Sequence, residues 1–289
     1  MPTLIRLPQQ ARAFPSGALR ERVLLLVVLL FALLALTGPV VLQPANYHDF
    51  ADQHAWGVLP HAMDVLSNLP FALWGLAGAG ALVQAYRLRE VDRTAGGLAA
   101  LFFAGLLVTT AVSAMYHWQP DNEGLVWDRT GMVLAFAGLL GLAAWQRVSS
   151  RAAWALAAIV LVLGPVSVQV WSMSGNLLPW GVLQFGGMAL IVGLACLPTL
   201  SLEAGRIHRG LPIRWSLVIA LYALAKVLEL GDHLVFEWTG HFISGHSLKH
   251  IVASCAAWPV VAALKDVVKS RAESGSPPRV QQAAIVHAA

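Results

Sequence analysis

Residues 96–117 have the sequence GGLAALFFAGLLVTTAVSAMYH, which contains no Asp, Glu, Lys or Arg. Because an α-helix rises about 1.5 Å per residue, a helix over this stretch would cross the roughly 30 Å hydrocarbon core of a bilayer. Apolar and polar residues do not alternate in it, as they do in the strands of a membrane barrel, so the pattern predicts a transmembrane α-helix. The stretch ends in Ser113-x-x-x-His117, and residues four apart lie on one helix face.

The whole chain shares the character of this stretch. Hydrophobic residues make up 57% and charged residues 12% of its 289 residues, and the mean hydropathy is +0.66. A soluble globular domain has about 25% charged residues, so this composition is typical of an integral membrane protein. Further apolar stretches of about 20 residues lie at 23–42, 63–86, 127–146, 152–171, 181–200, 214–236 and 246–264. We therefore expect an all-α integral membrane protein with eight transmembrane helices.

The charges between the predicted helices indicate the orientation of the chain. Lys and Arg are concentrated at 1–22, 87–95, 147–151, 201–214 and 265–289. Neither residue occurs in the alternate segments 43–62, 118–126, 172–180 and 237–245. Because basic loops stay in the cytoplasm, we expect both termini there and the alternate loops outside. The net charge of +4 then reflects anchors beside anionic headgroups and does not indicate a nucleic-acid partner.

The two ends of the chain differ from its apolar centre. Residues 1–22 are basic and are expected to form a cytoplasmic segment. The stretch 23–42 is expected to be an uncleaved transmembrane helix, since it is long for a signal peptide and no clear cleavage site follows it. Residues 266–289 are polar and include Pro-Pro, so we expect a disordered cytoplasmic tail there.

Polar residues at the outward ends of the predicted helices suggest a metal site. His117 ends one predicted helix and Asp128 begins the next. His246 and His250 lie four residues apart at the start of the last helix, so they share a face. Two histidines from one helix and one from another would give Zn²⁺ three ligands and leave its fourth position for water. Asp128 would take the proton of that water, and the Ser113 hydroxyl would donate to the developing oxyanion.

Each of these residues also has a structural interpretation. An H-x-x-x-H pair can occur by chance, Asp128 could accept hydrogen bonds at a helix start with Arg129 as its surface partner, and Ser113 could bond the carbonyl one turn back. Ionisable residues at membrane depth are costly, however, and tend to mark function. Their convergence on one leaflet therefore favours the metal site.

The predicted helix before the H-x-x-x-H pair carries further ionisable residues. A structural ion pair accounts for Lys226 with Glu229, which are three residues apart. Asp232 lies nearer the outer leaflet and is expected to accept a ring N–H from a zinc-bound histidine, which would fix the tautomer of that ring. His233 could act in the same way. Lys249 is expected to lie off the shared face of the two histidines and to reach a lipid headgroup.

Three segments together resemble a known family. They are Ser113-Ala-Met-Tyr-His117 followed by Trp127-Asp128-Arg129, Asp64-Val-Leu-Ser67-Asn68 before it, and His246-x-x-x-His250 after it. In this order and spacing they resemble the alkaline ceramidases of the CREST superfamily. The resemblance covers about residues 60–265. It implies a catalytic domain that is a seven-transmembrane-helix bundle of CREST type, with the helix at 23–42 as an extra N-terminal transmembrane helix.

The resemblance also implies a chemistry. It implies that zinc is held by His117, His246 and His250, that Asp128 acts with the zinc-bound water, and that Ser113 assists hydrolysis of the ceramide amide. Alkaline ceramidases also bind calcium through an acidic segment. The corresponding stretch here is Asn46-Tyr-His-Asp49-Phe-Ala-Asp52, which could bind a hard cation but is expected to be a solvated loop.

The expected function follows from these features. We expect a zinc-dependent intramembrane hydrolase, a multi-pass protein of the bacterial inner membrane with its active site toward the periplasmic leaflet. Its partner would be a membrane lipid, either ceramide or a related N-acyl lipid, whose amide bond it cleaves. A receptor-like or scaffold protein with a structural zinc site, similar to the progestin and adipoQ receptors, is the chief alternative. A haem or proton-coupled transport protein that uses the outward histidines is another.

Overall fold

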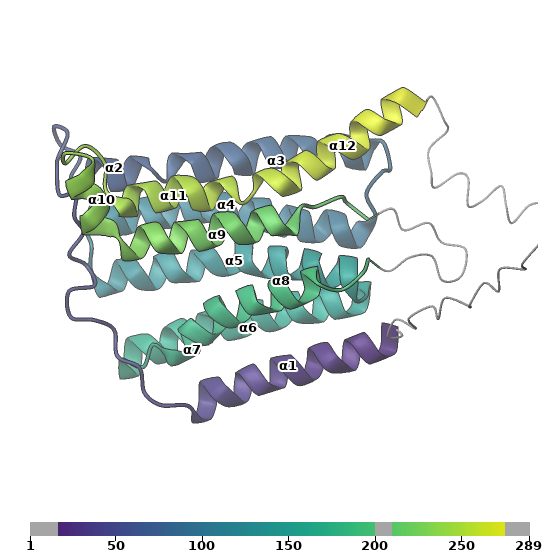
Figure 1. The fold of residues 1–289 in the computed structure, drawn as a ribbon, viewed down its shortest axis with the longest axis horizontal. Helices are drawn as coiled ribbons and strands as arrows, with labels where there is room; N and C mark the ends of the chain where they lie inside the picture. The colour runs from purple at the N-terminus through teal and green to yellow at the C-terminus, as the bar shows by residue number, and fades with distance from the viewer. Residues whose placement is uncertain (1–16, 200–209, 275–289) are drawn as a thin grey trace, which may run out of the picture.

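The structure, a computed structural model, describes residues 17–199 and 210–274. Every regular element in these two ranges is helical, and the helices lie side by side along one direction (Figure 1). They are α1 (Gly17–Thr37), α2 (Ala62–Leu66), α3 (Leu69–Arg87), α4 (Arg93–Trp118), α5 (Asn122–Arg147), α6 (Ser150–Ser174), α7 (Leu178–Gly181), the π-helix η1 (Val182–Gly186), α8 (Gly187–Ala195), α9 (Trp215–Leu230), α10 (Asp232–Trp238), α11 (Gly245–Cys255) and α12 (Trp258–Ser274).

Six stretches of the described chain are long and apolar enough to cross a membrane. They are Ala62–Arg87, Arg93–Trp118, Asn122–Arg147, Ser150–Ser174, Leu178–Ala195 and Gly245–Glu273. These spans confirm the prediction of an all-α, multi-pass membrane protein. The other two predicted spans coincide with α1, which begins with the charged run Arg20-Glu21-Arg22, and with α9, which has only 16 residues.

The predicted end segments need correction where the structure describes them. The helix predicted at 23–42 instead begins at Gly17 and ends at Thr37, so the last part of the expected N-terminal segment is helical. At the other end, α12 continues to Ser274, so the expected disordered tail does not begin at 266. Residues 1–16 and 275–289, where the rest of these two predictions falls, lie outside the described residues.

Three predicted transmembrane helices are interrupted. One break separates α2 from α3 just before Pro70, and another separates α11 from α12 just before Pro259. Proline lacks an N–H, and its ring clashes with the carbonyl four residues earlier, so it disrupts the helix that precedes it. Gly231 separates α9 from α10. The short helices α2 and α10 lie with the start of α11 at one end of the bundle (Figure 1).

Glycines bring α4 and α5 into close contact. A Cβ atom on Gly105 would lie 2.2 Å from the backbone nitrogen of Ala135, and one on Gly138 would lie 2.4 Å from that of Phe102. Small residues on both sides let two membrane helices approach at backbone distance. The contact fixes the relative position of the two helices whose ends carry the predicted site residues.

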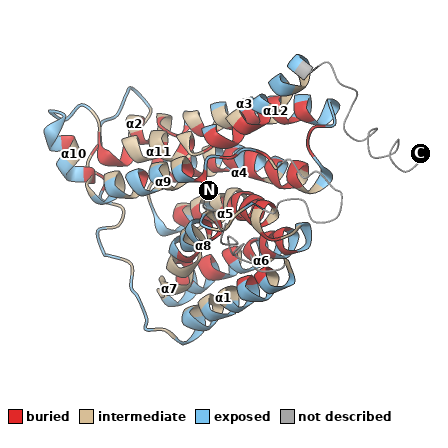
Figure 2. Cartoon of the chain, turned by 45° about the vertical axis from the view of Figure 1, so that its right-hand side comes forward, coloured by how far each residue is buried: buried red, intermediate tan, exposed pale blue. Residues whose placement is uncertain are grey.

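Helix α1 lies at the edge of the bundle. Leu25, Leu29 and Leu33 are each more than half exposed on it, and Figure 2 shows exposed residues along α1 and buried ones along α4 and α5. Apolar side chains that face a bilayer need no protein partner. The start of α1 and the end of α12 lie at the same end of the bundle (Figure 1), as an even number of crossings requires.

Candidate metal centre

Three histidines converge inside the bundle. His117 comes from the last turn of α4, and His246 and His250 come from the first turns of α11. One ligand atom of each residue lies within 4.8 Å of the others, and the residues are only 1%, 6% and 6% exposed. No other group of His, Cys, Asp or Glu within 17–199 and 210–274 is arranged to hold a metal ion. The predicted grouping is confirmed, and it is compatible with zinc.

The separation of the ring nitrogens suits a tetrahedral ion. The Nε2 atoms of His117 and His246 are 3.3 Å apart. In tetrahedral geometry, Zn–N bonds of about 2.0–2.1 Å place two ligand nitrogens about 3.3–3.4 Å apart. The three ring centroids form a nearly equilateral triangle with sides of 4.8, 4.9 and 4.9 Å. The three ring nitrogens are therefore compatible with a metal held by three nitrogen ligands.

A serine fixes the orientation of one of the three rings. The Ser67 hydroxyl lies 2.9 Å from the carbonyl oxygen of Asp64 and 2.8 Å from Nδ1 of His250. A carbonyl can only accept, so the hydroxyl donates its single proton to Asp64, and Nδ1–H of His250 donates to the hydroxyl oxygen. Nε2 of His250 then carries the lone pair that a metal ligand needs.

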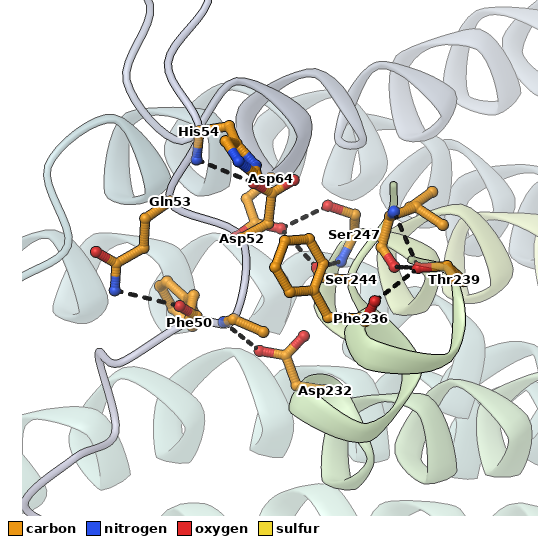
Figure 3. A network of polar contacts seen from close by, with 12 residues as sticks. Phe50, Asp52, Gln53, His54, Asp64, Asp232, Phe236, Thr239, Ser244 and Ser247 are labelled. Atoms are coloured by element: carbon orange, nitrogen blue, oxygen red, sulfur yellow. Dashed lines mark hydrogen bonds and ion pairs between the residues drawn. The ribbon is translucent and has the colours of Figure 1, made fainter. Parts of the chain in front are cut away.

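The Asp64 side chain supports this arrangement from behind (Figure 3). Asp64 is fully buried, and its Oδ1 accepts hydrogen bonds from the hydroxyls of Ser247 at 2.6 Å and Ser244 at 3.4 Å. These bonds join α2 to the start of α11. Because Ser67 directly follows α2, they also keep Ser67 beside His250. The buried Oδ2 of Asp64 has no hydrogen-bond partner among the described residues.

Asp232 has a different role from the one predicted. Its Oδ1 accepts the backbone N–H of His246 at 2.7 Å, and its Oδ2 accepts that of Ala51 at 2.9 Å. The carboxylate therefore holds the start of α11 and the loop at 38–61 rather than a histidine ring. The residue that accepts a ring N–H, that of His250, is Ser67 and not Asp232. His233 is exposed, and its Nε2 lies 3.2 Å from the carbonyl oxygen of Asp49, away from the histidine cluster.

The loop at 38–61 closes the histidine cluster on one side. The ring of Phe50 is 5% exposed, and its centroid lies 4.2 Å from that of His246 and 4.9 Å from that of His117. The possible calcium residues lie beside it but do not converge. Asp52 accepts both the backbone N–H and Nδ1 of His54, at 2.9 and 2.8 Å (Figure 3). Asp52 is 2% exposed. The expectation of a loop that is solvated along its whole length is therefore wrong at this residue.

A cavity of about 150 Å³ adjoins the histidines, and both predicted catalytic residues line it. Its walls include Ser113, Asp128 and His250. The Ser113 side chain makes a hydrogen bond to Asp128, and the Oδ1 atom of Asp128 is buried without a partner among the described residues. The structure thus brings together the carboxylate, the hydroxyl and one of the three ring ligands.

Arg129 does not pair with Asp128 at the surface, which was the alternative explanation for that aspartate. Arg129 is 2% exposed. Its guanidinium carbon lies 4.1 Å from the centroid of the Trp171 ring, and Nη2 donates to Oε1 of Gln43 at 2.7 Å. Asp128 therefore faces the cavity without forming an ion pair with Arg129.

The expectation for Lys249 is also wrong. Its Nζ lies 2.6 Å from Oε1 of Glu229, and Nζ of Lys226 lies 2.6 Å from Oε2 of the same carboxylate. All three side chains line the cavity. The three-residue spacing within α9 predicted the pair of Lys226 with Glu229. The contact with Lys249 depends on how α9 packs against α11, and no local spacing signals it.

No family model matches this chain, and no curated protein matches it. The likeness to the alkaline ceramidases therefore stays a prediction that rests on sequence motifs. The convergence of the three histidines is a separate observation, because it brings together side chains from two helices that are far apart in the sequence.

Proposed function

We propose that the chain is a zinc-dependent intramembrane hydrolase that cleaves the amide bond of ceramide or another N-acyl lipid. The observation that carries the proposal is one cavity lined by a hydrogen-bonded Ser113–Asp128 pair and by His250 of a buried three-histidine cluster. Apart from α9, the helices that line the cavity belong to stretches apolar enough to span a membrane. A lipid could therefore reach it from within the bilayer.

The three histidines would hold the zinc ion. Zinc bound at three nitrogen ligands supplies a water that ionises near neutral pH and a Lewis acid that polarises a carbonyl. The protein contributes the tautomer of His250 through Ser67 and excludes bulk water on one side with Phe50.

Asp128 would move the proton. Its unpartnered Oδ1 can accept a proton from the attacking water and later donate it to the nitrogen of the leaving amine. Water then adds across the C–N bond, and the products are a fatty acid and an amine. A carboxylate oxygen that lines the cavity and has no other partner is suited to both steps.

Ser113 would act after Asp128. Its single proton is donated to Asp128 while that residue is a carboxylate. Once Oδ1 of Asp128 carries the proton, the other carboxyl oxygen loses its charge and accepts more weakly, so the Ser113 hydroxyl can turn and donate to the oxyanion formed from the carbonyl. The same hydroxyl therefore first orients the base and then supplies the oxyanion donor.

The finer architecture belongs to this proposal. We assign the bundle to the CREST type, with α1 as the additional helix, and place it in a bacterial inner membrane with both termini cytoplasmic. The shared position of the start of α1 and the end of α12 (Figure 1) supports an even number of crossings. The loop over the histidines contains no Lys or Arg within 43–62, which supports a periplasmic site.

A receptor-like protein with a structural zinc site is the second candidate, favoured by the deep burial of the histidines under Phe50. A structural ion needs no base, so Asp128→Asn separates the two functions. We expect this variant to keep about one zinc ion per chain and to lose about 10²–10⁴-fold in turnover. The measurements are elemental analysis of purified protein and mass spectrometry of fatty acid released from N-acyl lipids. Turnover equal to wild type would overturn the role of Asp128, and zinc without any hydrolysis in wild type would favour the receptor.

A further inference from the structure

One carboxylate in the cavity is shared by two lysines. Oε1 of Glu229 accepts a hydrogen bond from Nζ of Lys249, and Oε2 accepts one from Nζ of Lys226, both at 2.6 Å. The side chains are 26%, 17% and 26% exposed for Glu229, Lys249 and Lys226. Each ammonium has three N–H donors, and its contact with Glu229 uses only one of them. The cluster therefore has donors to spare beside the cavity.

The charges of this cluster do not balance. Two ammonium groups face one carboxylate, which leaves one positive charge in a half-buried site. Asp128 also lines the cavity and interacts electrostatically with Lys249, but it lies beyond ion-pair distance of both lysines, so neither ammonium is paired with it directly. An unpaired charge away from water is costly, so an anion that enters the cavity would be stabilised by the lysines.

Other polar groups line the same cavity. Gln184 reaches the cavity from the π-helix η1, and π-helical turns frequently occur at functional sites. The buried hydroxyl of Tyr222 lines it too and has no hydrogen-bond partner among the described residues. Much of the remaining wall is apolar and includes Phe71, Phe102 and Leu106. Such a cavity suits a molecule with a polar group next to an apolar chain.

We propose that Lys226, Glu229 and Lys249 form a binding subsite for an anionic group on the amine side of the N-acyl substrate. The substrate class would then be an N-acyl amino acid or an N-acyl phosphoamine rather than neutral ceramide. This inference rests on the proposed function. The amide would lie at the end of the cavity with Ser113, Asp128 and His250, and the carboxylate or phosphate would receive N–H donors from the two lysines.

The test compares three probes that share one acyl chain: N-dodecanoylglycine, N-dodecanoylphosphoethanolamine and N-dodecanoylethanolamine, which is neutral. We expect kcat/KM to be about tenfold or more higher for an anionic probe than for the neutral one. The better of the two anionic probes identifies the source of the charge as a carboxylate or a phosphate. Equal kcat/KM for all three probes would overturn the subsite.

A set of lysine variants tests the location of the subsite. Lys226→Met is expected to raise KM for the anionic probe about tenfold with little change in kcat, because it removes binding that is uniform along the reaction. Lys226→Arg keeps the charge and should restore most of the affinity. Lys265→Met, on the exposed face of α12, is the matched control and should change nothing. If Lys265→Met also lost the preference for the anionic probe over the neutral one, the assignment to Lys226 would be overturned.

A binding measurement separates this inference from the proposed function. N-Dodecanoylglycine is titrated into the zinc-loaded Asp128→Asn variant by calorimetry, with and without Lys226→Met. Binding that requires Lys226, in a protein whose wild type hydrolyses no probe, would support the subsite and overturn the hydrolase. Hydrolysis with no preference for charge and no effect of Lys226→Met would support the hydrolase and overturn the subsite.

Discussion

Two cavities in this protein differ in size and in chemistry. The larger, about 460 Å³, lies between α1 and the helices α6 to α8, and apart from Ser167 and Asn176 its walls are apolar. The smaller, about 150 Å³, holds the Ser113–Asp128 pair, His250 and the Glu229 cluster. Ionisable residues at membrane depth are costly. Their concentration around the smaller cavity therefore indicates the functional site better than volume does.

Breaks in the helical path occur beside the smaller cavity. α3 and α11, which line it, each border such a break, whereas the π-helix η1 lines both cavities. Irregular backbone is tolerated within a membrane where it is buried in protein or lines a cavity. The irregular turns thus allow side chains from the helix ends to face the site.

The largest effect should come from removing a metal ligand. His250→Ala should reduce bound zinc from about one ion per chain to none, since two histidines alone leave an incomplete zinc site. Ser167→Ala, in the larger cavity, should keep the metal. Both variants are purified without chelators and measured by elemental analysis. Full zinc occupancy in His250→Ala would show that His250 is not a zinc ligand and that the metal is not bound beside the smaller cavity.

A smaller effect is expected from the residue that orients this ligand. Ser67→Ala leaves Nδ1 of His250 without its partner, and loss of such a contact typically weakens metal binding by about 10–100-fold. Competition with a chelator of known zinc affinity measures the change. Ser174→Ala is the control, since its hydroxyl bonds only nearby backbone, donating to the carbonyl of Val170 and accepting from the N–H of Asn176. Equal zinc affinity in the two variants would contradict the role of Ser67.

The packing of α11 can be tested with two glycines. A Cβ on Gly245 would lie 2.3 Å from the carbonyl oxygen of Leu228 and 2.8 Å from Cα of Asp232. Gly245→Ala should therefore destabilise the protein by about 1–3 kcal/mol, seen as a lower melting temperature. A Cβ on Gly193 meets nothing within 4 Å, so Gly193→Ala in α8 should be neutral or stabilising. An unchanged melting temperature in Gly245→Ala would show that α11 does not need this close approach.

Much of this fold could be predicted from the sequence because hydropathy and spacing are local. Each of the eight predicted spans overlaps a helix, and the i, i+4 pairing of His246 with His250 was visible directly. The breaks near Pro70 and Pro259 were missed, since a hydropathy average does not register a missing N–H.

The contacts between helices could not be predicted. The bond from His250 to Ser67, the backbone partners of Asp232 and the bond from Lys249 to Glu229 each join residues from different helices. These contacts depend on the rotation of one helix against another, and no periodicity within a single helix determines that rotation.

The smallest effect should come from the larger cavity. Leu163→Ala removes a side chain that is 45% exposed there. Because acyl chains of the bilayer can occupy the vacated space, turnover should stay within about twofold of wild type. Leu106→Ala makes the same chemical change at a 5% exposed wall of the smaller cavity. It should lower kcat/KM by about tenfold or more, since misplaced reacting groups lose rate steeply. If Leu163→Ala were instead the more harmful change, the substrate would have to pass through or bind in the cavity beside α1.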